Sequence, residues 1–140
     1  MCGIAAVWQR DGRPCRSADV LAMRDIQIHR GPDDAGIHID GPIGLGHRRL
    51  SILDLSAAGH QPMSNEDGSI WLVFNGEIYN YIELASTLRE HGHIFRSATD
   101  SEVILHLYEE EGPRCLQSLN GMFAFVLWDS RTQIMFPARD

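Results

Sequence analysis

The chain has 140 residues, with 12 basic side chains against 19 acidic ones and a formal net charge of −7. Apolar residues make up 44% and charged residues 22%, which is typical of one globular domain over residues 1–140. The acidic balance argues against general binding of nucleic acid or of anionic membranes. Because every basic residue is arginine, a Schiff-base enzyme and a lysine-bearing phosphate loop are excluded within this segment.

Two features bear on where the protein works. The longest apolar run, Met122 to Trp128, has seven residues, whereas roughly 18 or more are needed to span a bilayer. The three cysteines form an odd, sparse set, which fits a reducing compartment better than a disulfide framework. We therefore expect no membrane segment and a cytoplasmic protein.

The first half of the chain predicts strands around one helix. A buried strand is expected from Ile4 to Trp8, and a helix from Ser17 to about Ile28 with Ser17 as its cap. The breaker-rich segment His29–Asp34 predicts a loop. Two strands are expected next, over Ala35–Ile39 and Ile43–Leu50.

The second half predicts two helices between strands. The expected elements are, in order, a loop-rich stretch over Ser56–Gly68, a buried strand over Ile70–Phe74, a helix from Tyr81 stopped by Gly92, a helix over Ser101–Glu111, and a hairpin of Phe123–Trp128 with Gln133–Phe136. Strands at both ends with helices in the middle predict an α+β protein built on antiparallel sheet, not parallel βαβ units.

Cys2 is the most informative position for chemistry. Removal of the initiator methionine would leave a cysteine with a free α-amino group, which is partly uncharged near neutral pH and can accept the thiol proton. Nucleophile and base would then belong to one residue. The alternative is a small buried side chain at the start of a strand, which is where lone cysteines usually lie.

Asn75 and Gly76 follow the predicted strand Ile70–Phe74. An Asn amide and a Gly N–H are suitable donors for the oxyanion of a tetrahedral intermediate. The alternative is a type I′ hairpin turn, for which Asn-Gly is the strongest dipeptide signal. A hairpin requires a returning strand, however, and Ile78-Tyr79 leads within a few residues into a helix.

Arginine and aspartate side chains suggest how an α-amino acid could be held. Arg49 could grip an α-carboxylate bidentately, or form with Arg48 a solvated surface pair. Asp100 could receive a substrate ammonium, or cap the following helix, a task that Thr99 could perform instead.

Metal and nucleotide sites are not expected. Of seven histidines only His91 and His93 are closely spaced, and no HExxH or Cys-x-x-Cys pattern is present. No glycine-rich phosphate cradle of either common type occurs. We therefore expect no metal ion and no cofactor within residues 1–140.

Several motifs together resemble one family. The chain is similar to the class II glutamine amidotransferase domain of glutamine-hydrolysing asparagine synthetases. The motifs occur in family order and cover essentially the whole chain: Met1–Ile4, His29–Asp33, Arg49–Ile52, Asn75–Asn80, Asp100–Ile104 and Leu119–Phe125.

The resemblance implies an N-terminal-nucleophile fold, an αββα sandwich of two antiparallel sheets between helical layers. It implies hydrolysis of L-glutamine to glutamate and ammonia through a thioester on Cys2. Asn75 and Gly76 correspond to the oxyanion hole.

The resemblance also supplies the substrate contacts. Arg49 corresponds to the clamp on the glutamine α-carboxylate, and Glu77 with Asp100 to the groups that hold its α-ammonium. The loop from Arg30 to Asp33 corresponds to one that frames the nucleophile. The rest of the glutamine pocket corresponds to Leu50, Ser51, Ile52 and Leu53.

The resemblance further implies a partner. Leu50–Asp54 follows Arg49 where other branches of the class carry Trp or Tyr, which favours ammonia supply for ATP-dependent asparagine synthesis from aspartate. In the family the domain continues beyond Asp140 and is followed by a synthetase domain, so we expect an incomplete domain, with the synthetase in cis or in trans. ATP and Mg²⁺ are expected only for that domain, and the assembly could be a homodimer.

Three alternatives remain open from the sequence. The glutaminase could serve an acceptor that is a sugar or another carboxylate. The chain could be a different N-terminal-nucleophile amidohydrolase, although Arg49 and Asp100 favour an α-amino-acid substrate. It could also be an inactive fragment or an interaction module, which only the position of Asp140 at the end of the chain suggests.

Overall fold

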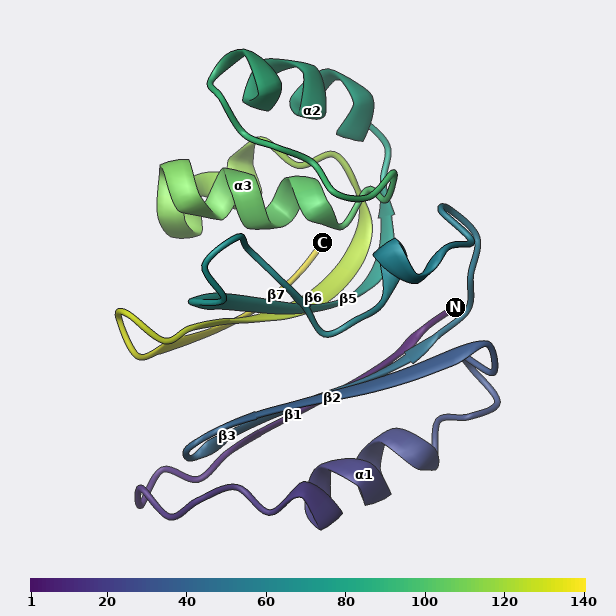
Figure 1. The fold of residues 1–140 in the computed structure, drawn as a ribbon, viewed down its shortest axis with the longest axis vertical. Coiled ribbons are helices and arrows are strands. Elements are labelled where there is room, and N and C mark those ends of the chain that lie inside the picture. Colours follow the sequence, from purple (N-terminus) through teal and green to yellow (C-terminus); the bar gives the residue numbers. More distant parts are fainter.

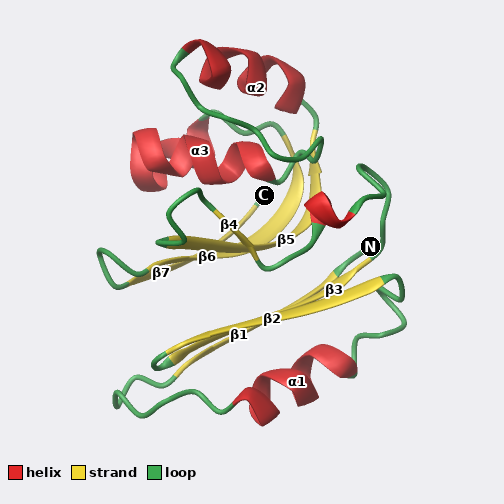
Figure 2. Cartoon of the chain, viewed as in Figure 1, coloured by secondary structure: helices red, strands yellow, loops and turns green.

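The computed structural model describes all residues from Met1 to Asp140 as four layers. Two antiparallel sheets face each other in the middle, with helix α1 (Ser17–Asp25) outside one sheet and helices α2 (Tyr81–Glu90) and α3 (Glu102–Glu111) outside the other (Figure 1). Figure 2 shows the same arrangement, with the strands enclosed between helices. The predicted αββα sandwich is confirmed. No helix is long and apolar enough to cross a membrane.

The first sheet has three strands in the order β1-β3-β2. Their bounds are Gly3–Trp8 for β1, Asp34–Asp40 for β2 and Ile43–Arg49 for β3. Every residue of β3 is buried, because β3 is the central strand and is covered by α1 on one face and by the second sheet on the other. The register places Gly3 opposite Arg48, so the chain start lies beside the end of β3.

The second sheet has four strands in the order β4-β5-β6-β7. Their bounds are Met63–Ser64, Ile70–Ile78, Gly121–Asp129 and Ile134–Arg139. Strands β5 and β6 pair over their whole length, from Ile70 opposite Asp129 to Ile78 opposite Gly121. Pro137 lies within β7, opposite Val126, and is tolerated there because β7 is an edge strand that need not donate outward.

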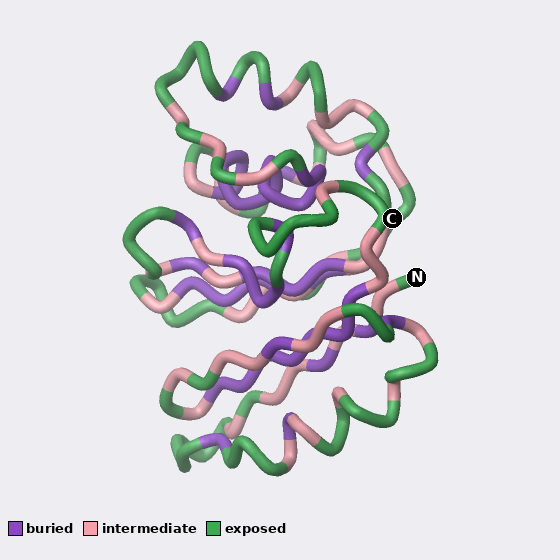
Figure 3. The backbone as a smooth tube through the Cα atoms, turned by 45° about the vertical axis from the view of Figure 1, so that its right-hand side comes forward, coloured by how far each residue is buried: buried purple, intermediate pink, exposed green.

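Two short 3₁₀ helices complete the chain, Ala57–Gly59 before β4 and Gly112–Gln117 after α3. The main hydrophobic core, with 16 buried residues, lies between the second sheet and its helices. A smaller cluster of Ile43, Leu45, Val73 and Trp128 lies between the two sheets. In Figure 3 the buried residues follow the inner strands and α3, whereas α2 is largely exposed. The second sheet is therefore packed mainly against its helices.

The structure departs from the predictions at element boundaries. Strand β5 continues to Ile78, four residues beyond its predicted end, because β6 pairs with it throughout. The first helix ends at Asp25, and Ser17 is not its cap: the cap is Arg16, which makes no side-chain capping bond. The helix predicted from Ser101 begins at Glu102.

Candidate active site

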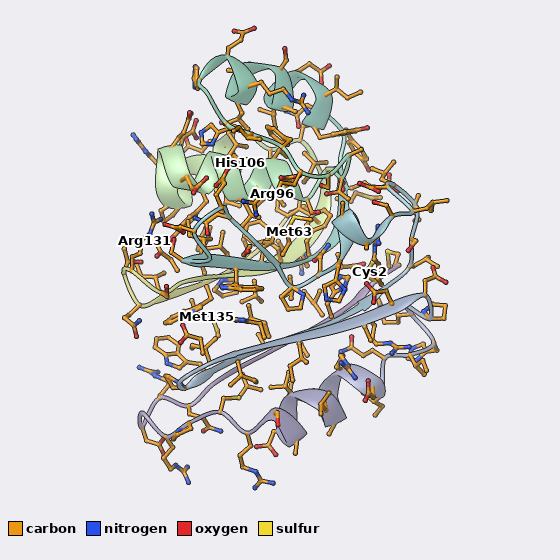
Figure 4. All side chains as sticks on the ribbon, in the orientation of Figure 1. Cys2, Met63, Arg96, His106, Arg131 and Met135 are labelled. Atoms are coloured by element: carbon orange, nitrogen blue, oxygen red, sulfur yellow. The ribbon has the colours of Figure 1, made fainter.

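A cavity of about 420 Å³ opens where the ends of the two sheets meet, beside the first residues of the chain. In Figure 4 the labelled Cys2 lies at this end, between the sheets. The walls of the cavity come from the chain start, the end of β3, the loop to β4, the second half of β5, the segment just before α3, and strands β6 and β7. Most of the residues singled out in the sequence line it: Cys2, Arg49, Leu50, Ile52, Leu53, Asn75, Gly76, Glu77 and Asp100.

Cys2 is half-buried in this wall, preceded by an exposed Met1. Its sulfur accepts a hydrogen bond from the Leu50 N–H (3.4 Å) and lies 3.8 Å from the Leu50 carbonyl oxygen. The Arg30 Nε donates to the Cys2 carbonyl oxygen (3.0 Å). These bonds hold the backbone and the sulfur of Cys2 against the end of β3, so the thiol faces the cavity and is not packed in a core.

The other two cysteines differ from Cys2. Cys15 and Cys115 are buried, and all three thiols are free. Burial, assisted by the charge of Glu111, raises the pKa of Cys115 to about 11. Burial also raises the pKa of Cys15, with a smaller contribution from Asp19. A thiolate is therefore disfavoured at both buried positions, and neither thiol lines the cavity.

Asn75 and Gly76 lie within β5, so the hairpin interpretation of this dipeptide is wrong. Gly76 has a φ of +156°, and a Cβ added there would lie 2.2 Å from the Met122 carbonyl oxygen. Only glycine fits this close approach of β5 to β6. The half-buried Asn75 beside it lines the cavity.

The N–H groups along this part of β5 point to the cavity edge. The Phe74 N–H donates to Gln61 Oε1 (2.7 Å), and the Ile78 N–H donates to Asp100 Oδ2 (2.8 Å). Alternate residues of a strand direct their N–H groups to the same edge. The N–H of Gly76 therefore points to the cavity, between two neighbours whose N–H groups already have partners.

Arg49 lies under the loop that follows β3. Its Nη1 donates to the Ser56 carbonyl oxygen (3.0 Å), and its Nη2 donates to the carbonyl oxygens of Leu53 (3.2 Å) and Asp54. A Cβ on Gly59 would lie 2.0 Å from Nη2, so a larger residue there would displace the guanidinium from this position. A guanidinium has five N–H groups, of which these bonds use three. Arg49 thus holds the loop after β3 in place and keeps two N–H groups that have no partner in these bonds.

Asp100 is a buried carboxylate without a cation. It is 7% exposed, its Oδ2 accepts the Ile78 N–H, and it belongs to none of the ion pairs of the chain. Burial raises the pKa of Asp100, the backbone N–H groups oppose the rise, and the negative charge of Glu77 adds to it. A cation placed between Asp100 and the exposed Glu77 would stabilise both carboxylates.

The alternative role of Asp100 as a helix cap is not observed. The cap of α3 is Ser101, whose side chain makes no capping bond. The neighbouring Glu102 instead accepts the N–H groups of Arg96 and Ser97, each at 2.8 Å. Asp100 is therefore free of a helix-capping task and faces the cavity.

The loops around Cys2 are joined by polar contacts. The Ser51 N–H donates to Asp33 Oδ2 (2.8 Å), and Arg48 Nε donates to the Gly31 carbonyl oxygen (2.9 Å). Ser51 does not line the cavity, unlike Leu50, Ile52 and Leu53 on either side of it. Ser51 therefore joins the segment after β3 to the loop before β2.

Sequence reasoning missed Gln61 and Gly59, which support this site. Gln61 is 6% exposed and supports β5 through Phe74, and Gly59 permits the closure over Arg49. Both lie in the loop-rich stretch before β4, where no periodicity marks a buried position. Further cavity-lining residues, to which the sequence analysis gave no part in the site, are Phe74, Thr99, Ser101, Met122, Phe123, Ala124, Arg139 and Asp140.

Comparisons with known proteins give one consistent result. Residues 1–140 match a family model described as a glutamine amidotransferase domain. The chain is 45% identical over 143 residues to the glutamine-hydrolyzing asparagine synthetase 2 of Bacillus subtilis, an alignment that covers 100% of the chain and 19% of that protein. It is 47% identical over 141 residues to a glutamine-hydrolyzing asparagine synthetase of Triphysaria versicolor, with 100% and 24% covered.

Among solved structures, the glutamine phosphoribosylpyrophosphate amidotransferase of B. subtilis has a similar fold. The TM-score is 0.77 at 22% sequence identity, and the match covers 100% of this chain and 37% of that one. The chain spans about a fifth to a quarter of the length of the curated relatives named above.

Proposed function

The chain belongs to the glutamine amidotransferase domain family, and we propose that it hydrolyses L-glutamine to glutamate and ammonia at the cavity beside Cys2. The observation that carries this proposal is that three groups meet in one cavity. They are the half-buried thiol of Cys2, the carboxylate of Asp100, which has no positively charged partner, and the N–H of Gly76, which points into the cavity.

The reaction begins once Met1 has been removed. The freed α-amino group of Cys2 takes the thiol proton, and the sulfur attacks the carboxamide carbon of glutamine. The carbonyl π electrons move to the oxygen, and the Asn75 amide and the Gly76 N–H donate to the resulting oxyanion. The intermediate then collapses, the C–N bond breaks, and the amide nitrogen leaves as ammonia with the proton from the α-ammonium group.

The second half of the cycle hydrolyses the thioester. Water, deprotonated by the same α-amino group, adds to the thioester carbon, and the same two donors hold the second oxyanion. Collapse of that intermediate breaks the C–S bond, returns the proton to sulfur and releases glutamate. No metal ion is required for this sequence of steps, since one residue supplies nucleophile and base.

The α-ammonium and α-carboxylate groups of glutamine also find binding partners in the cavity. Asp100 and Glu77 supply the negative charge that an α-ammonium requires, which matches the uncompensated burial of Asp100. An N–H group of Arg49 that these bonds leave free can receive the α-carboxylate, while three others hold the Leu53–Ser56 loop beside the cavity. Leu50, Ile52 and Leu53 enclose the aliphatic part of the side chain.

The proposal also names the molecule that accepts the ammonia. The relatives named above are glutamine-hydrolyzing asparagine synthetases, and this chain covers 19% of one and 24% of the other. We therefore place aspartate as the acceptor, on an ATP- and Mg²⁺-dependent synthetase domain supplied in cis or in trans. A cytoplasmic, reducing setting suits a nucleophile that must remain a free thiol.

A glutamine hydrolysis assay on the purified chain tests the proposal. We expect glutamate and ammonia in equal amounts from glutamine in a preparation whose intact mass shows loss of Met1, and no turnover by Cys2→Ala. Cys15→Ala is the matched control, because it removes a cysteine that lies outside the cavity, and it should retain turnover. Full turnover by Cys2→Ala, or by a chain that keeps Met1, would contradict the mechanism.

A further inference from the structure

A second polar cluster lies in the α3 layer, away from Cys2. It consists of Glu66 in the turn between β4 and β5, His93 in the segment after α2, and His106 and Glu109 on α3; we call it the α3 histidine cluster. Figure 4 labels His106 on α3, separate from Cys2 at the end of the sheets. None of its four members lines the cavity of the candidate active site.

The ligand-type atoms of this cluster converge on one point. The Nδ1 atoms of His93 and His106 lie 3.1 Å apart, and Glu109 Oε2 lies 3.1 Å from His106 Nδ1 and 3.7 Å from His93 Nδ1. Glu66 Oε1 lies 3.9 Å from His106 Nδ1. Ligand atoms of Glu66, His93 and His106 all lie within 4.8 Å of one another. We propose that the α3 histidine cluster binds a divalent transition-metal ion of the Zn²⁺ type.

The separations fit a four-coordinate ion. With metal–nitrogen and metal–oxygen distances of about 2.0–2.2 Å, two ligand atoms of a tetrahedral site lie roughly 3.3 Å apart. The imidazole and Glu109 atoms are already close to this separation. The exposed Glu66, whose Oε1 lies 3.9 Å from His106 Nδ1, would complete the set by moving closer, and imidazole with carboxylate is a ligand combination that suits Zn²⁺.

The far nitrogen of each imidazole faces a carboxylate. His93 Nε2 lies 3.1 Å from Glu110 Oε1, and His106 Nε2 lies 3.8 Å from Glu102 Oε1. Metal-binding histidines usually direct their second nitrogen to such a carboxylate, which fixes the tautomer and leaves the other nitrogen unprotonated for the metal. Both histidines therefore present Nδ1 to the site with a carboxylate behind them.

His106 also has an unpartnered atom that a bound cation would explain. It is 2% exposed, and its Nε2 is buried without a hydrogen-bond partner. If the ring carries its proton on Nδ1, an unshielded Nε2 lone pair faces the Glu102 carboxylate, which is unfavourable. A cation at Nδ1 moves the proton to Nε2, where the N–H points toward that carboxylate and each nitrogen has an interaction of the correct sign.

The carboxylates of the cluster lack a permanent positive partner. The ion pairs of Glu66, Glu109 and Glu110 are with histidines, and none is with an arginine. Asn65 Nδ2 donates to Glu109 Oε1 (2.8 Å), which leaves Oε2 directed to the site. A divalent ion would neutralise this local negative charge and tie the β4–β5 turn to α3.

Titration of the full chain with ZnCl₂ tests the proposal. The chain is prepared without an affinity tag, dialysed against EDTA and carries Cys2→Ala, so that the half-buried thiol of the cavity does not compete for metal. Calorimetry should show one ion per chain with Kd below about 10 μM, and Co²⁺ should give visible d–d absorption. At a free Zn²⁺ concentration about 100 times Kd, linkage should raise the Tm by about 5–10 °C.

Two partly exposed ligands provide variants that should keep the fold. His93→Asn should weaken Zn²⁺ binding at least tenfold and abolish the Tm rise, and Glu66→Gln should weaken binding by a smaller factor. His29→Asn, which removes an exposed histidine between α1 and β2, should bind as the parent does. Absence of saturable one-to-one binding, or equal affinity in the parent and His93→Asn, would overturn the proposal.

Discussion

His47 ties the two sheets together at the site and makes the stability of the chain sensitive to acid. It lies in β3, is fully buried, and its Nε2 is 3.0 Å from the Phe74 carbonyl oxygen of β5. Its Nδ1 is buried without a hydrogen-bond partner. Burial lowers the pKa of His47 from 6.5 to about 4, an effect opposed by the bond to Phe74 and by Asp34.

Acid destabilises the folded chain because His47 takes up its proton at a higher pH in the unfolded chain than in the folded one. The unfolded chain takes up a proton on this residue as the pH falls through 6.5, whereas the folded chain takes it up only near pH 4. The free energy of unfolding therefore decreases between these values and levels off below the lower one. At about 1.36 kcal/mol per pH unit, the loss is about 2 kcal/mol at pH 5 and about 3 kcal/mol when complete.

Urea unfolding at pH 7 and pH 5 measures this loss. His47→Gln can still donate to the Phe74 carbonyl but does not titrate, so its loss of stability over this interval should be about 2 kcal/mol smaller than that of the unmodified chain. His29→Gln, which removes an exposed imidazole, provides the matched comparison. Equal losses in the unmodified chain and His47→Gln would refute the argument that this buried ring stays neutral in the folded state.

Three further substitutions examine the candidate active site. Asn75→Ala should lower kcat for glutamine hydrolysis by about 10²–10³ through loss of one oxyanion donor; a fall in thermal stability with unchanged turnover per folded molecule would assign Asn75 a purely structural part. Asp100→Ala should mainly raise KM, because the ion pair with the substrate ammonium exists in both ground and transition states, and an effect on kcat alone would contradict the binding role. Gly76→Ala should lower the Tm and abolish turnover, since its Cβ would lie 2.2 Å from the Met122 carbonyl oxygen; circular dichroism and the hydrolysis assay check both, and a fully active, stable variant would contradict the close approach.

The elements that the sequence predicts well are those with a single strong periodicity. The spacing of Tyr81, Leu84 and Leu88 predicts α2, which the structure confirms at Tyr81–Glu90. The continuation of β5 through Asn75 and Gly76 could not be predicted in this way, because these residues favour turns. Nine residues of pairing with β6 outweigh that local preference.

The sequence predicts those site residues that belong to a recognisable motif. It does not predict residues that reach the site only through the folding of the chain. Cys2, Asn75 and Asp100 were found from residue type and family motifs, and they line one cavity. Gln61 could not be found, because its part is to accept the Phe74 N–H from a loop without periodicity. The cluster around His106 could not be found either, because His93 and Glu66 reach it from other segments of the chain.

The central claim is that Cys2 is the nucleophile of a glutamine-binding cavity. An electrophilic glutamine analogue, followed by mass spectrometry of the digested chain, tests it most directly. We predict labelling of Cys2 alone in chains that have lost Met1, with protection by excess glutamine, because Cys15 and Cys115 are buried and their pKa values are raised. Labelling of Cys15 or Cys115 to the same extent as Cys2, or labelling of Cys2 that glutamine does not slow, would contradict the claim.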